Sequence, residues 1–313
     1  MCQEPLSVTV LCACEGRFET AYSRLRSFFP QVDFIRENDF KEQVLDQLER
    51  VSTPLFMFGC DDVVFKRTWE PVQIWRTFQE LPELFGFSLR LGKEITFSGT
   101  LGRNMSNPHF HRTDPFLVWN WYGGELDWGY PWEIDCTIYP TQFVRDMLMA
   151  VRKLDWAHPN KLEGVVAYLI RPMKALYWVA HHPRAGANFI NGAAREILTR
   201  GHGPNAMHRK PGGSLSDLVR GMATLRPLRL MASYPLARAS VITINRVQDV
   251  ALNLVSKDPM SADGLLEMWT RGMILDTDRY IGRSYRSIHI ADASFKTRSN
   301  GTNVHSDQSD SMA

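Results

Sequence analysis

Short apolar segments alternate with amphipathic ones along the first part of the chain. Residues 7–14 (SVTVLCAC) and 32–36 (VDFIR) are rich in β-branched and aliphatic side chains, which predicts two strands. After each of them, apolar residues recur every three or four positions, as on the buried face of a helix. A third apolar run, residues 53–60 (TPLFMFGC), predicts a buried strand and ends in the adjacent carboxylates of Asp61 and Asp62. This order of elements predicts a mostly parallel α/β sheet flanked by helices, of the Rossmann type.

Polar residues follow each of the three predicted strands. They are residues 15–17, Asn38 and the pair Asp61-Asp62. Ligands of parallel α/β sheets bind at the carboxyl ends of the strands, so we expect a binding site along this edge. The side chains of Asn38 and Asp39 are also suited to cap the helix that follows them.

Later segments predict further elements of the same domain. Residues 84–92 (LFGFSLRLG) and 116–122 (FLVWNWY) read as strands, and helices are expected over residues 141–153 and from Asn160 onward. Residues 296–313 have no apolar face, which predicts a disordered tail.

Composition and charge exclude several classes of function. The net charge of +2 is too small to indicate nucleic-acid binding through the overall field. Apolar runs are all shorter than the roughly 18 residues that a membrane helix requires, and the N-terminus lacks the basic region of a signal peptide. The five cysteines contain no CxxC pair, which favours reduced thiols and a cytoplasmic protein.

Residues 181–238 differ from the rest of the chain in charge. Nine arginines and lysines face two acidic residues there, on an otherwise nearly neutral background. The segment is rich in glycine, so we expect mostly loop. It is either a solvated insertion or a flexible arm for an anionic partner, such as a diphosphate or an anionic membrane surface.

The Asp61-Asp62 pair needs an explanation, because adjacent like charges at the edge of a core are costly. The chain has no GxxxxGK[ST] loop, and no GxGxxG follows its first strand. A divalent cation held by the two carboxylates, which in turn neutralises a diphosphate, is one interpretation. The other is structural, with one carboxylate capping a turn and its neighbour solvated.

Residues 53–65 (TPLFMFGCDDVVF) resemble the metal-binding DXD-type motif of GT-A-fold glycosyltransferases, in the family 2-like group that uses nucleotide sugars. Residues 130–148 resemble the segment of that group that faces the acceptor, and 158–164 (HPNKLEG) the position of an acidic residue beside it. Residues 242–249, 265–276 and 287–292 resemble the C-terminal end of a subset of these proteins. Together these stretches leave out roughly residues 172–238.

The resemblance implies a single GT-A-like domain with two functional halves. Residues 1–125 would bind the donor and 126–295 the acceptor, with the basic segment as an insertion. Residues implied for the nucleotide are Ala13, Glu15, Arg17, Asn38 and Asp61, and those for Mn²⁺ or Mg²⁺ are Asp61, Asp62 and His289. The adjacent Asp pair departs from the usual spaced motif, which leaves open which carboxylate contacts the metal.

Two carboxylates are candidates for the catalytic base. Asp135 follows the aromatic residues Trp128, Tyr130 and Trp132, and aromatic faces stack well on sugars. Glu163 stands three residues after Asn160, which is also the spacing of a helix capping box. Either residue has a structural alternative, and a retaining mechanism needs neither as a base.

We therefore expect a metal-dependent glycosyltransferase that moves a sugar from a nucleotide sugar to a glycan, lipid-linked or protein acceptor. The first candidate for the donor is a UDP-sugar. The alternative is a nucleotide- or carbohydrate-binding protein of similar fold without transfer activity. A nucleotidyltransferase is a weaker alternative, because residues 14–20 (CEGRFET) are not a glycine- and lysine-rich loop.

Overall fold

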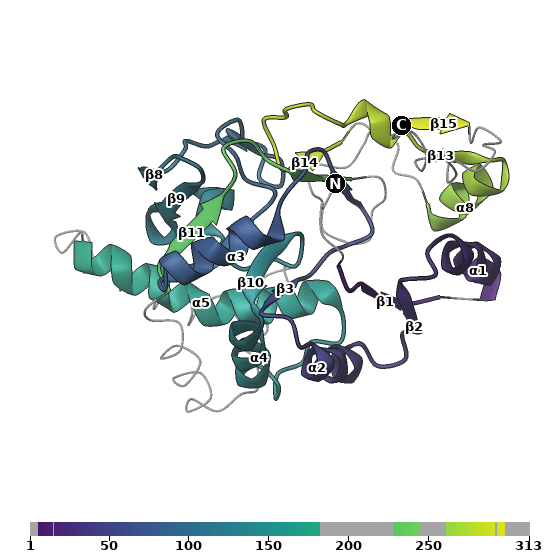
Figure 1. The fold of residues 1–313 in the computed structure, drawn as a ribbon, viewed down its shortest axis with the longest axis horizontal. Helices are drawn as coiled ribbons and strands as arrows, with labels where there is room; N and C mark the ends of the chain where they lie inside the picture. Colours follow the sequence, from purple (N-terminus) through teal and green to yellow (C-terminus); the bar gives the residue numbers. More distant parts are fainter. Residues whose placement is uncertain (1–5, 15, 182–227, 244–260, 292, 298–313) are drawn as a thin grey trace, which may run out of the picture.

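The computed structural model describes residues 6–14, 16–181, 228–243, 261–291 and 293–297 (Figure 1). They form an α/β fold in which helices cover both faces of a central mixed sheet.

The central sheet has six strands, and its order brings together distant parts of the chain. Across the sheet the strands are β3 (Leu55–Met57), β10 (Thr137–Pro140), β5 (Leu84–Ser88), β11 (Leu230–Ser233), β9 (Leu117–Asn120) and β8 (Phe110–Arg112). β5 and β11 run parallel, whereas the other neighbouring pairs are antiparallel. The expectation of a mostly parallel sheet is therefore wrong for this sheet.

The position of β10 explains the difference. Ile138 of β10 lies opposite Met57 of β3 on one side and Phe87 of β5 on the other, antiparallel to both. Parallel neighbours are usually joined through an α-helix, whereas the chain between β5 and β10 contains short strands and 3-10 helices and no α-helix. Periodicity in the first third of the sequence did not reveal that a later strand separates β3 from β5.

Smaller sheets surround the central one. They are the parallel pair β1 (Thr9–Cys12) and β2 (Asp33–Arg36), the sheet of β14 (His289–Ile290), β12 (Ala239–Ile242) and β4 (Val63–Phe65), the pair β13 (Met273–Leu275) and β15 (Phe295–Thr297), and the hairpin β6 (Phe97–Ser98) and β7 (Arg103–Asn104). The parallel pairing of β1 with β2 confirms that part of the prediction.

The helices predicted after the first two strands, over residues 141–153 and from Asn160 onward are present in the structure, which also contains helices that were not predicted, α3 (Pro71–Glu80) and α8 (Ala262–Thr270). The predicted helices are α1 (Glu19–Phe28), α2 (Phe40–Arg50), α4 (Thr141–Ala150) and α5 (Pro159–His181). Short 3-10 helices cover Gly16–Phe18, Trp121–Gly123, Leu126–Gly129 and Thr277–Arg279. Asp39 caps α2, because its Oδ1 accepts a hydrogen bond of 3.1 Å from the Glu42 amide. Asn160 lies inside α5 rather than before it, so the predicted capping box is wrong.

β5 contributes side chains to two clusters of the core. Phe85 belongs to the cluster that includes residues of α4 and α5, whereas Leu84 and Phe87 belong to the cluster that includes residues of α3. Gly86 stands between them, and a Cβ at this position would lie 2.8 Å from the ring of Tyr139. The sheet is thus buried on both sides, which explains its nearly continuous apolar strands.

Two predicted boundaries differ from the structure. Leu230–Ser233, assigned to the basic insertion, is strand β11 near the middle of the central sheet. Phe295–Thr297, at the start of the predicted tail, is strand β15. Residues 182–227 and 298–313 lie outside the described residues. Within the described part of the chain, no helix combines the length and apolarity needed to cross a membrane.

Candidate active site

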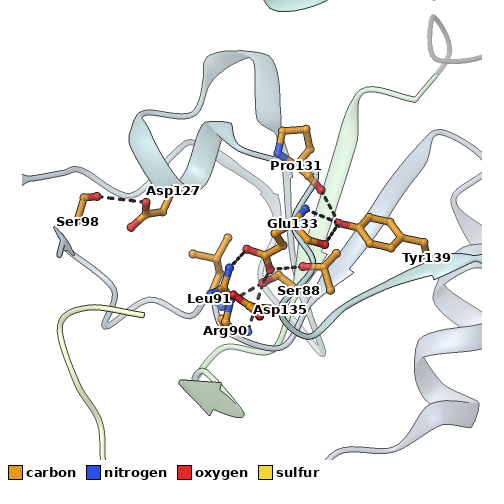
Figure 2. A network of polar contacts seen from close by, with 10 residues as sticks. Ser88, Arg90, Leu91, Ser98, Asp127, Pro131, Glu133, Asp135 and Tyr139 are labelled. Atoms are coloured by element: carbon orange, nitrogen blue, oxygen red, sulfur yellow. Dashed lines mark hydrogen bonds and ion pairs between the residues drawn. The ribbon is translucent and has the colours of Figure 1, made fainter. Parts of the chain in front are cut away.

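A buried arginine lies at the centre of the candidate site (Figure 2). Arg90 follows β5, and its side chain is 5% exposed. Its guanidinium forms an ion pair with Glu133 and a second one, 3.3 Å long, with Oδ2 of Asp135. A buried charge is tolerated when it is paired and hydrogen-bonded, which this arrangement provides.

Glu133 is held from several sides. The hydroxyls of Ser88 and Thr137, cross-strand partners in β5 and β10, both donate to its Oε1. Its backbone amide donates to the hydroxyl of Tyr139, 2.9 Å away, and that hydroxyl lies 3.1 Å from the Pro131 carbonyl. Glu133 is thus fixed in position, with its charge directed at Arg90 (Figure 2).

Asp135 reaches the site through an unusual backbone conformation. The next residue, Cys136, has a φ of 60°, a left-handed value that non-glycine residues adopt at a cost. Two backbone hydrogen bonds keep it there, since its amide donates to Phe58 at 2.9 Å and its carbonyl accepts from Leu89 at 3.1 Å. The strained residue lies between Asp135 and β10, where strain often accompanies a functional site.

The turn of Asp61 and Asp62 connects two sheets. After β3 the chain leaves the central sheet, turns at the Asp pair and enters β4, which belongs to the three-stranded sheet. Burial and the nearby charges of Asp135 and Asp61 raise the pKa of Asp62 to about 7. Burial and Asp135 also raise the pKa of the Cys60 thiol.

Glu163 faces the same carboxylates from the start of α5. Burial is the main reason that its pKa is raised to about 7; Asp135 and Glu133 raise it further, against the opposing charge of Arg90. The nearby hydroxyl of Tyr130 lowers the pKa of Glu163 slightly, because it favours the carboxylate form. We call Asp62, Glu133, Asp135 and Glu163 the carboxylate cluster around Arg90.

His289 approaches from the C-terminal part of the chain. It lies on β14, whose partner β12 also pairs with β4, and the Ile242 amide donates to the Asp62 carbonyl at 2.7 Å. Burial and the charge of Arg90 lower the pKa of His289 to about 4. The imidazole is therefore neutral near neutral pH, the form in which histidine binds a metal.

The residues predicted for the nucleotide lie along a neighbouring edge. Ala13 and Asn38 are exposed just after β1 and β2, which are paired in register. Arg17 is also exposed and forms an ion pair of 2.7 Å with Asp263 of α8. Asp61 connects this edge to the carboxylate cluster and is exposed. Burial raises the pKa of Tyr22 on α1, and the negative charge of Asp61 raises it further. Glu15 lies outside the described residues.

The aromatic residues of this region have different environments. Trp119, Trp121 and Trp128 are buried, so they fill the core rather than line a binding surface. Trp132 is also buried, whereas Tyr130 is exposed.

The residues present fit a divalent cation at the Asp pair. Asp61, Asp62 and Asp135 lie close enough for mutual repulsion to raise the pKa of Asp62, and a cation would relieve that repulsion. Among the residues that the structure describes, no three His, Cys, Asp or Glu side chains form a preformed metal site. The fit is that of a cation bound by few carboxylates together with a diphosphate, as for Mg²⁺.

Comparison with known proteins adds an independent observation. Over 290 residues the chain is 24% identical to the bifunctional glycosyltransferase pgtA of Dictyostelium discoideum. The chain is similar to a glycosyltransferase. The match covers 88% of this chain and 32% of pgtA, so the chain spans about a third of the length of the curated relative it matches. No protein-family model matches the chain, and no solved structure matches it.

Arg90 and Glu133 were not among the residues predicted for the site. The signal for Arg90 was a charge within the apolar run of residues 84–92, which already indicates a buried partner. Glu133 lies two residues before Asp135 in a run of aromatic residues, and sequence offers no means of pairing it with Arg90.

Proposed function

We propose that this protein is a metal-dependent glycosyltransferase with a GT-A-like fold. It moves a sugar from a nucleotide-sugar donor to a hydroxyl of an acceptor, and a UDP-sugar is the first candidate for the donor. The observation that carries the proposal is the meeting of Asp62, Asp135 and Glu163 around Arg90. The similarity to pgtA along most of the chain supports it.

The donor would bind along the edge that joins Ala13, Asn38 and the Asp pair. Asp61, on the side of β1, is suited to the ribose, and Asp62, beside Asp135, to the cation and the diphosphate. Asp61, Asp62 and the neutral imidazole of His289 are the side chains that would hold Mn²⁺ or Mg²⁺ with the diphosphate. A bound cation would stabilise the negative charge of the leaving nucleoside diphosphate.

Glu163 is the better candidate for the base. A general base is most effective when its pKa lies near the working pH. The pKa of Glu163 is raised to about 7. Asp135 is instead held in an ion pair with Arg90. The acceptor oxygen would bond to the anomeric carbon as its proton passes to Glu163. The bond between that carbon and the phosphate oxygen breaks, and the nucleoside diphosphate leaves with the electron pair. This is an inverting transfer.

A donor screen tests the proposal. UDP-, GDP- and TDP-sugars are added with and without Mn²⁺, and thermal stability and release of the nucleoside diphosphate are measured. We expect one nucleotide class to stabilise the protein in a Mn²⁺-dependent manner and to be hydrolysed slowly, since water can replace the acceptor. Binding without hydrolysis or transfer would favour the non-catalytic alternative, and no binding in any combination would refute both.

A further inference from the structure

We infer that the acceptor is a neutral saccharide whose ring stacks on the exposed face of Tyr130, next to Glu163. The inference rests on the transfer reaction proposed above and names its acceptor class. It follows from the exposure of one aromatic ring, the charge of its surroundings and the rigidity of the segment that carries it.

The aromatic run before Asp135 leaves one ring available to a ligand. Trp128 and Trp132 are 1% and 0% exposed, whereas Tyr130 between them is 39% exposed. Burial and the neighbouring charge of Glu163 nevertheless raise the pKa of its hydroxyl, which therefore lies close to Glu163. Tyr130 is therefore partly open to solvent, with its hydroxyl beside the candidate base. Aromatic rings with one apolar and one polar end suit this kind of site.

Charge favours a neutral acceptor over an anionic one. The carboxylate cluster contains Asp62, Glu133, Asp135 and Glu163, against the guanidinium of Arg90. An acceptor that carries a diphosphate would bring like charge to Glu163, which is unfavourable in a partly buried site. A saccharide instead offers hydroxyl donors to carboxylates and an apolar C–H face to the ring of Tyr130.

The segment that carries Tyr130 is held firmly in place. The indole of Trp128 donates to the Ile95 carbonyl at 3.2 Å, and its own carbonyl accepts from Trp119 at 3.0 Å. Lys174 of α5 donates to the Gly124 carbonyl at 2.7 Å. A platform fixed in this way loses little conformational entropy when a ligand binds.

Gly164 of α5 borders open space. It directly follows Glu163, and a Cβ built there meets no heavy atom within 4 Å. Glycine inside a helix is about 0.5–1 kcal/mol less favourable than alanine, so helix stability does not explain the glycine at this position.

Kinetics with simple acceptors test the inference. The acceptors are methyl glycosides of common hexoses and N-acetylhexosamines, whose small aglycone cannot stack by itself, with the donor identified in the screen. We expect Tyr130→Ala to raise the acceptor KM about tenfold or more, while the Mn²⁺-dependent affinity for the donor nucleotide stays within about twofold of wild type. Tyr130→Phe keeps the ring, so its acceptor KM should stay close to that of wild type.

A matched control uses an exposed ring elsewhere. Phe29 is 45% exposed and follows α1, at the end of that helix opposite to the donor edge. Phe29→Ala should change neither the acceptor KM nor the donor KM.

Two results would overturn the inference while leaving the proposed function intact. One is an unchanged acceptor KM in Tyr130→Ala. The other is transfer to a prenyl-diphosphate-linked acceptor but to none of the methyl glycosides. If wild type processes no donor at all, the proposed function fails. Saturation-transfer NMR with the methyl glycosides then still decides the inference, because binding lost in Tyr130→Ala supports it and absence of binding to wild type refutes it.

Discussion

Arg90 links most of the candidate site at the scale of single residues. It pairs with Glu133 and Asp135, and its charge opposes the burial that raises the pKa of Glu163. Removing one partner of a buried pair leaves an uncompensated charge, which costs more than the pair contributes. The network therefore affects both stability and the protonation of the proposed base.

The pH dependence of transfer should report Glu163. Because its pKa is raised to about 7, the carboxylate that accepts a proton is populated above that pH and lost below it. We expect kcat to fall as the pH decreases through about 7, and Glu163→Gln to lose about a hundredfold or more in kcat with unchanged donor affinity. Asp135→Asn is the matched comparison. A larger loss of kcat in Asp135→Asn, with a nearly active Glu163→Gln, would reverse the assignment.

Arg90→Met should lower the free energy of unfolding by about 3 kcal/mol, because Glu133 then stays buried without its partner. The double variant Arg90→Met/Glu133→Gln should recover at least about 1 kcal/mol of that loss. Urea denaturation of wild type, both single variants and the double variant measures the coupling. Additive effects of the two substitutions would mean that the pair is not an energetic unit.

At the scale of elements, the sequence predicted local structure better than strand neighbours. The pairing of β1 with β2 and the cap of Asp39 on α2 follow from nearby residues. The insertion of β10 beside β3 depends on a segment far away in the chain. Local patterns do not contain such pairings, since periodicity describes which face is buried and not which strand lies beside it.

The same limit applies to the candidate site. The Asp pair was recognisable as a candidate site from its position at the end of a predicted strand, and Glu163 from the resemblance of residues 158–164. The capping interpretation of Glu163 was wrong because α5 begins at Pro159, before Asn160. Arg90 and Glu133 meet only because β5 and β10 are neighbours, which no sequence spacing reveals.

Two glycines offer a test of the packing between elements. A Cβ at Gly86 of β5 would lie 2.8 Å from the buried ring of Tyr139, so Gly86→Ala should destabilise the protein by about 1–3 kcal/mol. Gly164→Ala, inside α5 and next to open space, should instead stabilise it by about 0.5–1 kcal/mol. Thermal denaturation of both variants measures the two changes. Equal effects would contradict the packing of β5 against β10.

At the scale of the whole molecule, the site is assembled from both halves of the chain. β4, which follows the Asp pair, is joined through β12 to β14 with His289. Arg67, just after β4, donates to the carbonyls of Ala237 and Gly282 at 2.9 and 2.8 Å. The position of the Asp pair thus depends on residues more than a hundred positions later, and the two predicted halves do not form separate structural units.

Asp62 provides the most direct test of the central claim, that the Asp pair holds a divalent cation with a nucleoside diphosphate. Calorimetric titration with UDP, with and without Mn²⁺, compares wild type with Asp62→Asn. The asparagine variant should be folded and slightly more stable above about pH 7, by about 1–2 kcal/mol after allowance for solvent screening. The reason is that a raised pKa means that ionised Asp62 destabilises the folded protein. This destabilisation is fully present above about pH 7 and absent at low pH, where Asp62 is protonated. We predict Mn²⁺-dependent binding of UDP to wild type and its loss in Asp62→Asn; equal, metal-independent binding to both would contradict the account.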